Sequence, residues 1–286
     1  MPSNFHPRLM TAADLSACDE LRSLAGWNQT IADWQQFLAT QPDGCFVIEE
    51  RGHVLGCVTT ICYGSTLAWI GMMLVHPDER RRGIGRVLMK RCLAYLDGCG
   101  IKCMKLDATP AGQPLYEQLG FASEWTLTRW SRSKRGGLFS KSNSPCRDCT
   151  PNDLERVIAL DATAFGVRRE ELLRALVAHS ERVLVAEAGG QVIGAGLLRS
   201  GARANYLGPV VADSPETAAS LIGELLSVSA SENVFWDIPD ANAAAIELAV
   251  AHGFERARTL TRMARGEPRV IHQTQHIFAI ADPALG

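Results

Sequence analysis

The feature that most constrains the fold of this chain is a weak internal repeat. Three short motifs recur in the same order, each roughly 135 residues further along: 11–15 recurs at 150–154, 46–49 at 184–187, and 120–129 at 253–262. The last pair shares Gly-Phe followed by Thr-Leu-Thr-Arg. Such a period is too long for a solenoid and has the length of a small domain. We therefore expect the 286 residues to hold two copies of one domain.

A stretch with few apolar residues lies between the copies. It reads Ser-Arg-Ser-Lys-Arg-Gly-Gly at 131–137 and Ser-Lys-Ser-Asn-Ser-Pro at 140–145. This composition has little to bury and predicts a linker. We expect a first domain at 1–131, a linker at 132–145 and a second domain at 146–286.

Apolar periodicity predicts the same order of helices and strands in each copy. In the first copy we expect a helix at 14–24, strands at 45–50, 54–61, 68–75 and 102–106, a helix from Ile84, and a short helix at 114–119. Strands that alternate with helices indicate a mixed α/β (α+β) layer architecture.

Composition excludes several classes of protein. The formal net charge is only −2, which argues against a nucleic-acid partner or an anionic membrane surface. No apolar run reaches the roughly 18 residues of a membrane span, and the N-terminus lacks the apolar core of a signal peptide. The nine cysteines are scattered, which indicates a reduced, cytoplasmic protein. Cys146 and Cys149 lack a second ligand pair, so no metal is expected.

The segment 75–85 joins an apolar run to an amphipathic helix. A helix N-terminus leaves backbone N–H groups unpaired and carries partial positive charge. Gly83 and Gly85 allow close approach, and three arginines at 80–82 add charge. The segment is therefore a candidate pyrophosphate site, although a turn with solvated arginines fits equally well. It is not a P-loop, because the sequence GxxxxGK(S/T) is absent, and it does not fit the dinucleotide fingerprint, because residue 88 is leucine in place of the third glycine.

This segment, Val-x-Pro-x-x-Arg-x-x-Gly-x-Gly, resembles the acetyl-CoA signature of the GNAT acetyltransferases. Downstream, 116–121 resembles the Tyr-x-x-x-Gly-Phe element of that family. The resemblance covers 5–131 well and 146–280 weakly, and it is similar to tandem GNAT proteins with a degenerate C-terminal half. It implies two GNAT-like domains, each a mixed, mostly antiparallel sheet flanked by helices.

The resemblance also implies how acetyl-CoA is held. The strand at 68–75 would splay from the strand at 102–106. The pantetheine arm of acetyl-CoA would lie in the gap between them, and a backbone N–H there would polarise the acetyl carbonyl. The implied binding groups are backbone groups of the strand, amides of the loop and arginine side chains: Met73, Leu74, Val75, Arg80, Arg81, Arg82, Gly83, Ile84, Gly85 and Arg86.

Two residues are candidates for catalysis. Tyr116 matches the family tyrosine that donates a proton to the CoA sulfur, or else it packs one face of a short helix. The strand at 68–75 holds no carboxylate, so the general base is open. Asp107 is the first candidate, with Glu49, Asp33 and a water relay as alternatives. Asp107 would otherwise cap the turn that begins near Thr109.

The region between the first two helices lines the acceptor pocket in GNAT enzymes. Trp27, Asn28 and Trp34 lie there and suit an apolar substrate with polar handles. Packing between the helices, with Thr30 as N-cap, is the alternative.

The second copy lacks the loop signature. Residues 210–219 contain neither the arginines nor the glycine pair, and Asp213 and Glu216 would repel a pyrophosphate. Ala249 stands where Tyr116 stands in the first copy. We expect this half to be non-catalytic and to brace the first domain, close its acceptor pocket or bind an effector. Residues 276–281 are expected to form a closing strand.

The sequence thus predicts an acetyl-CoA-dependent N-acetyltransferase. It would act by direct attack of a primary amine of a small molecule or peptide. The alternative, motivated by the missing carboxylate, is a CoA-binding sensor or regulatory module without transfer activity. A scaffold of two decayed copies would leave the intact loop unexplained. The sequence is compatible with a homo-oligomer and does not name the amine.

Overall fold

The computed structural model describes residues 5–133, 146–229, 231 and 233–286. Most of the expected linker, 134–145, lies outside the described residues. The first half contains β1 (Arg8–Leu9), α1 (Leu15–Leu24), α2 (Ile31–Thr40), β2 (Phe46–Glu50), β3 (His53–Tyr63), β4 (Leu67–Val75), α3 (Ile84–Gly98), β5 (Cys103–Ala108), α4 (Gln113–Gln118) and β6 (Ala122–Arg132). The second contains β7 (Cys146–Asp148), α5 (Leu154–Phe165), α6 (Glu170–Ala178), β8 (Ser180–Ala188), β9 (Gln191–Arg199), β10 (Asn205–Ala212), α7 (Pro215–Val228), β11 (Val234–Pro239), α8 (Ala243–Ala251), β12 (Glu255–Gly266) and β13 (Ile277–Ala279).

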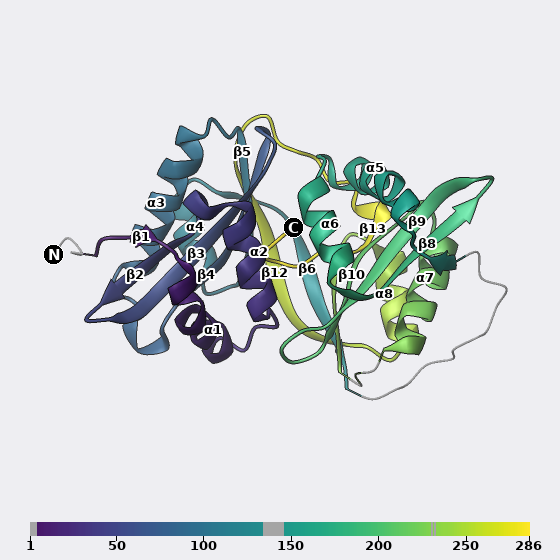
Figure 1. Cartoon of the computed structure of the whole chain (residues 1–286), viewed down its shortest axis with the longest axis horizontal. Coiled ribbons are helices and arrows are strands. Elements are labelled where there is room, and N and C mark those ends of the chain that lie inside the picture. The colour runs from purple at the N-terminus through teal and green to yellow at the C-terminus, as the bar shows by residue number, and fades with distance from the viewer. Residues whose placement is uncertain (1–4, 134–145, 230, 232) are drawn as a thin grey trace.

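The two halves repeat one order of elements, as the internal repeat predicts. In each half a short strand precedes two helices, three antiparallel strands, a helix, a parallel strand, a short helix and a long strand. The expected helices and strands of the first copy are all present, with shifts of a few residues at their ends. Figure 1 shows the halves as two lobes with β6 and β12 crossing between them.

Helices cover both faces of the sheet in each lobe. In the first half, α1 and α2 pack on one face, through residues such as Leu21 and Phe37. α3 packs on the other face, through residues such as Leu88 and Cys92. The apolar positions of α3 recur every three or four residues, so one side of the helix is buried and the other is exposed. No helix in the described part of the chain combines the length and the apolar character that a membrane crossing needs.

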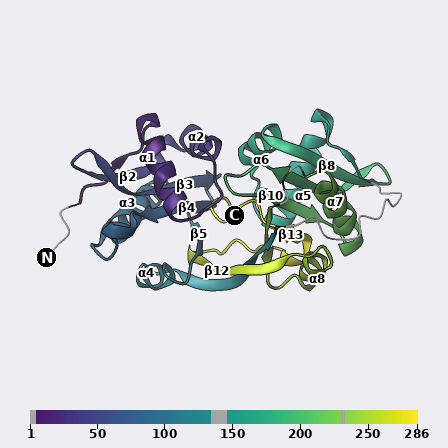
Figure 2. The ribbon, with the colours of Figure 1, turned by 90° about the horizontal axis from the view of Figure 1, so that it is seen from below.

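The halves exchange their long C-terminal strands. The 13-stranded sheet runs β1-β2-β3-β4-β5-β12-β6-β11-β10-β9-β8-β7, with β13 paired to β10. Strand β12 of the second half therefore lies between β5 and β6 of the first, and β6 lies between β12 and β11. Figure 2 shows β12 spanning the lower side of both lobes. A boundary at residue 131 or 146 separates the copies in sequence, but the sheet interleaves them.

Two buried ion pairs join the exchanged strands to their neighbours. Arg262 on β12 donates two hydrogen bonds of 2.8 Å to the carboxylate of Asp107 on β5, and both side chains are 0% exposed. Arg129 on β6 binds Asp237 on β11 in the same way, at 2.9 and 2.5 Å. Each arginine ends a Thr-Leu-Thr-Arg motif and crosses to the opposite half. The two motifs pair with each other, and Leu127 stands opposite Leu260 at their centre. A pseudo-twofold axis that relates the two halves therefore passes between these leucines.

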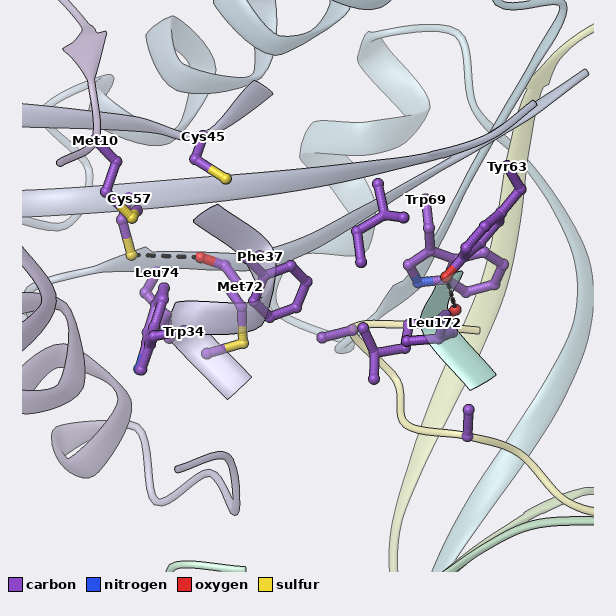
Figure 3. Close-up of a cluster of buried hydrophobic side chains, with 14 of the residues drawn as sticks. Met10, Trp34, Phe37, Cys45, Cys57, Tyr63, Trp69, Met72, Leu74 and Leu172 are labelled. Carbon is purple, nitrogen blue, oxygen red and sulfur yellow. Dashed lines mark hydrogen bonds between the residues drawn. The ribbon is translucent and has the colours of Figure 1, made fainter. Parts of the chain in front are cut away.

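One apolar core also runs across the junction. Trp34, Trp69 and Tyr63 of the first half share a cluster with Phe165 and Leu172 of the second. Figure 3 shows this cluster from Met10 to Leu172, with Trp34 packed beside Leu74 and Met72. The halves therefore share a core rather than meeting at a polar domain interface.

Removing one partner of a buried ion pair leaves the other charge unpaired. We expect Arg262→Met to lower the free energy of unfolding by about 3–5 kcal/mol, because Asp107 loses its counter-ion in a solvent-free site. Urea denaturation followed by circular dichroism would measure the change. The matched control is Arg174→Met, which breaks an exposed pair with Glu170 and should cost about 1 kcal/mol or less. Equal losses in the two variants would contradict a structural role for the Arg262 pair.

Candidate active site

Strands β4 and β5 diverge and leave one edge of β4 open. They pair in parallel at three positions only, from Leu67 opposite Cys103 to Trp69 opposite Lys105. Beyond them a β-bulge interrupts β4, where Met72 has a φ of 47° and the pairing with β3 shifts. No described strand pairs with β4 on the β5 side after Trp69. This edge holds Met73, Leu74 and Val75, as the resemblance implied, and it offers backbone groups to a ligand.

The corresponding gap in the second half is filled by the chain itself. β10 and β11 also pair at three positions, from Asn205 opposite Val234 to Leu207 opposite Trp236. After this point β13 pairs with β10, with Val210 opposite Ala279. The closing strand expected at 276–281 is therefore present as β13. β13 provides hydrogen-bond partners for backbone groups of β10, whereas the equivalent groups of β4 in the first half have none from a described strand.

The N-terminus of α3 faces the open end of β4. Gly83 is its N-cap, with a φ of 88°, a left-handed conformation that suits glycine. The Val87 N–H donates to the Gly83 carbonyl at 3.1 Å, which closes the first turn. In the described part of the chain, the amides of Gly83, Ile84, Gly85 and Arg86 have no acceptor. Unpaired amides at a helix N-terminus favour an anion such as a pyrophosphate.

The four candidate arginines fall into two groups. Arg82 forms ion pairs with Glu79 and Glu50 and stacks over Phe5. Arg86 donates to the side chain of Gln118. Arg80 and Arg81 are exposed, and neither forms an ion pair with a described residue.

A cavity opens beyond the point where β4 and β5 separate. It has about 540 Å³ of empty space, part of it open to solvent. Its walls come from both halves: Trp27, Gln29, Ile70, Gly71, Met72, Met73, Leu106, Asp107, Thr109, Tyr116, Arg258, Leu260, Pro283 and Ala284.

Tyr116 lies at this cavity on α4. Its ring packs edge-on against Phe121 at a centroid distance of 6.2 Å, and the residue is 8% exposed. Its hydroxyl forms no hydrogen bond with a described residue. Burial raises the pKa of the Tyr116 phenol above its usual value, so the group stays protonated at neutral pH. Tyr116 is therefore a hydrogen donor at the cavity.

Asp107 also lines the cavity, but Arg262 holds both of its carboxylate oxygens. Burial raises the pKa of Asp107, and the charge of Arg262 opposes that shift. The expected turn cap is not formed by Asp107, because Thr109 Oγ1 itself accepts from the Gly112 N–H at 3.2 Å. The bidentate ion pair occupies one lone pair on each oxygen and turns the carboxylate towards Arg262 on β12.

The two weaker base candidates are bound elsewhere. Glu49 pairs with Arg8 on the far strand β1. Asp33 forms the capping box of α2 with Thr30, as the sequence suggested for that threonine. Neither carboxylate lines the cavity.

The three acceptor candidates separate in space. Trp27 lines the cavity. The Asn28 side chain joins the two halves. Its Nδ2 donates to Ala204 O at 3.0 Å, and its Oδ1 accepts from the N–H groups of Ala204 at 3.0 Å and Arg203 at 2.9 Å. Trp34 is 0% exposed in the core and does not line the cavity (Figure 3). Gln29 lines it instead, one position beyond Asn28.

The second half supplies part of the cavity wall, which sequence patterns did not identify. Arg258 and Leu260 come from β12, and Pro283 and Ala284 from the segment after β13. This segment is held by Trp69 Nε1, which donates to Pro283 O at 3.0 Å, and by Tyr63 Oη, which donates to Leu285 O at 2.7 Å. A Cβ on Gly71 would lie 2.6 Å from Ala284 O, so the segment packs directly on β4.

Comparison with known proteins agrees with this geometry. The model of the acetyltransferase (GNAT) family matches residues 13–121, and that of the acetyltransferase (GNAT) domain matches 157–279. The uncharacterized N-acetyltransferase YitH of Bacillus subtilis is 26% identical over 243 residues, which are 82% of each chain.

Solved structures show the same fold over the whole chain. A putative acetyltransferase from Pyrococcus horikoshii has a TM-score of 0.86 at 24% identity and covers 100% of this chain and 97% of its own. A tandem GNAT protein from the clavulanic acid biosynthesis pathway has a TM-score of 0.66 at 17% identity, over 93% and 100%. Since both halves match GNAT models and the fold is that of a tandem GNAT protein, the chain belongs to the GNAT acetyltransferase family and carries two of its domains in tandem.

Proposed function

We propose that this protein is an acetyl-CoA-dependent N-acetyltransferase that acetylates a primary amine of a small molecule or peptide. The observation that carries the proposal is the open edge of β4, which lies between the free amides of α3 and a cavity that contains Tyr116. The first domain, 1–131, is catalytic. The second, 146–286, is non-catalytic, because β13 fills its gap and its α7 begins with Ser214, Pro215 and Glu216 in place of arginines.

The residues of the first half fit acetyl-CoA. The amides of Gly83 to Arg86 bind the pyrophosphate, and the exposed Arg80 and Arg81 add charge. Arg82 and Arg86 hold the loop through Glu79 and Gln118. The pantetheine arm pairs with backbone groups of 73–75, as a strand would.

Acetyl-CoA supplies a thioester whose carbonyl carbon accepts the amine. The amine nitrogen forms the new C–N bond as the C–S bond breaks. A backbone N–H at the β4 edge polarises the carbonyl, and the Tyr116 hydroxyl donates a proton to the departing sulfur. The amine proton passes to water rather than to Asp107, because the carboxylate of Asp107 is turned towards Arg262 on β12.

The same occupied carboxylate favours a second candidate function, a CoA-binding sensor without transfer activity. It predicts acetyl-CoA binding with no thiol release across a broad panel of primary amines. Detection of released CoA thiol in the presence of amines separates the two functions.

We expect Gly83→Asp to weaken acetyl-CoA binding about 100-fold or more. The new carboxylate would stand at the anion site, in a backbone conformation with a φ of 88° that disfavours a side chain. Calorimetric titration would measure it. Gly100→Asp is the matched control: its φ is 72°, no atom lies within 4 Å of an added Cβ, and it follows the opposite end of α3. Similar affinity in both variants would exclude this loop as the binding site.

Tyr116→Phe should lower kcat about 100-fold and leave acetyl-CoA affinity within about threefold, because only the proton donor is removed. Steady-state thiol release and calorimetry would separate the two effects. Tyr95→Phe is the control, since the Tyr95 hydroxyl bonds Gln41 away from the cavity. Unchanged turnover in Tyr116→Phe would remove its assigned role.

A further inference from the structure

Arg258 places a charge at the cavity from the second half of the chain. β5 ends at Ala108, which pairs with Thr261, so the β12 residues before Thr261 extend past the end of β5. Side chains alternate along a strand, which puts Arg258 and Leu260 on the same face of β12 as Arg262. Both Arg258 and Leu260 line the cavity.

This guanidinium has no partner in the described part of the chain. Arg258 forms no hydrogen bond or ion pair there, and its Nε is buried without an acceptor. The nearby carboxylates are used: Asp237 binds Arg129 and Asp107 binds Arg262. Burial and the neighbouring Arg129 lower the pKa of Arg258, and the nearby carboxylates of Asp237 and Asp282 offset only part of this effect.

Asp282 does not fill this role. Its Oδ1 accepts from Gln29 Nε2 at 2.7 Å and from the Ala284 N–H at 2.8 Å. No guanidinium nitrogen of Arg258 lies within 4.0 Å of a carboxylate oxygen of Asp282, so the two residues form no ion pair. Asp282 therefore positions Gln29 and the chain segment that closes the cavity.

Gln29 presents a complementary group. Its Nε2 is committed to Asp282, so its Oε1 is an acceptor, and this atom is buried without a partner. The cavity thus has an unpaired cation on one strand and an unpaired acceptor in the loop between α1 and α2. Buried polar groups without partners are costly, and a ligand that supplies both partners would remove that cost.

We propose that the acceptor is a free amino acid, whose carboxylate binds Arg258 and whose amino group donates an N–H to Gln29 Oε1. This inference rests on the proposed transferase function. A planar carboxylate matches the fork of a guanidinium, and one unpaired arginine balances one negative charge. A phosphate would need a second cation, and Arg258 is the only described lining residue that is a cation. The remaining walls, including Trp27, Met72 and Leu260, suit an apolar side chain.

The test compares amines that differ only in the carboxylate. Leucine, methionine and phenylalanine are assayed beside their amides by CoA thiol release, with O-phosphoethanolamine beside ethanolamine as the phosphate arm. We expect kcat/KM to favour each acid over its amide by about 10–100-fold. In Arg258→Met the acids should fall to the level of the amides, and the amides should change less than about threefold. Arg258→Lys, which keeps a cation, should retain part of the preference.

Arg256→Met is the matched control, because Arg256 lies on the same strand with 58% of its side chain exposed and outside the cavity. It should keep the preference for acids. Calorimetric affinity for acetyl-CoA and the melting temperature confirm that each variant is folded.

Each outcome decides one point. Equal acetylation of acids and amides, or a preference that survives Arg258→Met, overturns the carboxylate assignment and leaves the transferase function standing. A preference confined to the phosphate pair overturns it as well. Binding of acetyl-CoA without acetylation of any amine overturns the proposed transferase function, and the acceptor assignment with it.

Discussion

The reciprocal ion pairs between Arg262 and Asp107 and between Arg129 and Asp237 hold the two halves together inside one sheet. Each buried arginine needs a carboxylate, and each finds it on a strand of the opposite half. An unpaired charge in such a site is strongly unfavourable, so the pairs hold β12 beside β5 and β6 beside β11. The 13-stranded sheet, the shared apolar core and the position of β12 all follow from this exchange.

The exchange makes the second half part of the site in the first. Since β12 lies beside β5, Arg258 and Leu260 reach the cavity next to Tyr116. The segment after β13 then returns across the junction and packs on Gly71 of β4. A half that lacks the loop signature therefore still shapes the acceptor cavity. Its retention needs no separate activity, because the cavity of the first half is incomplete without it.

Local patterns predicted most of the fold, whereas the cavity depended on contacts between distant residues. Periodicity and glycine placement gave the helices, strands and loop of the first half, because these features arise within a few residues. The roles of Asp107 and Asn28 were less accessible, since their partners Arg262 and Ala204 lie in the other copy. The repeated Thr-Leu-Thr-Arg motif did carry a signal, because a fully buried arginine is rarely found without a partner such as a carboxylate. Which carboxylate faces it depends on the strand exchange, and the repeat alone does not specify that.

The two gaps in the sheet explain why the copies diverged in opposite ways. Where two strands separate, backbone N–H and C=O groups lose their partners and must be satisfied by another group. In the second half β13 does this permanently, so the arginines and glycines of a ligand loop have no function there. In the first half the groups of β4 stay available, and a ligand that pairs with them would stabilise the folded state by an amount that grows with the logarithm of its concentration. Under the proposed function, the open gap couples the stability of the first half to acetyl-CoA. In the second half β13 closes the gap, and the segment that follows it lines the cavity together with Arg258.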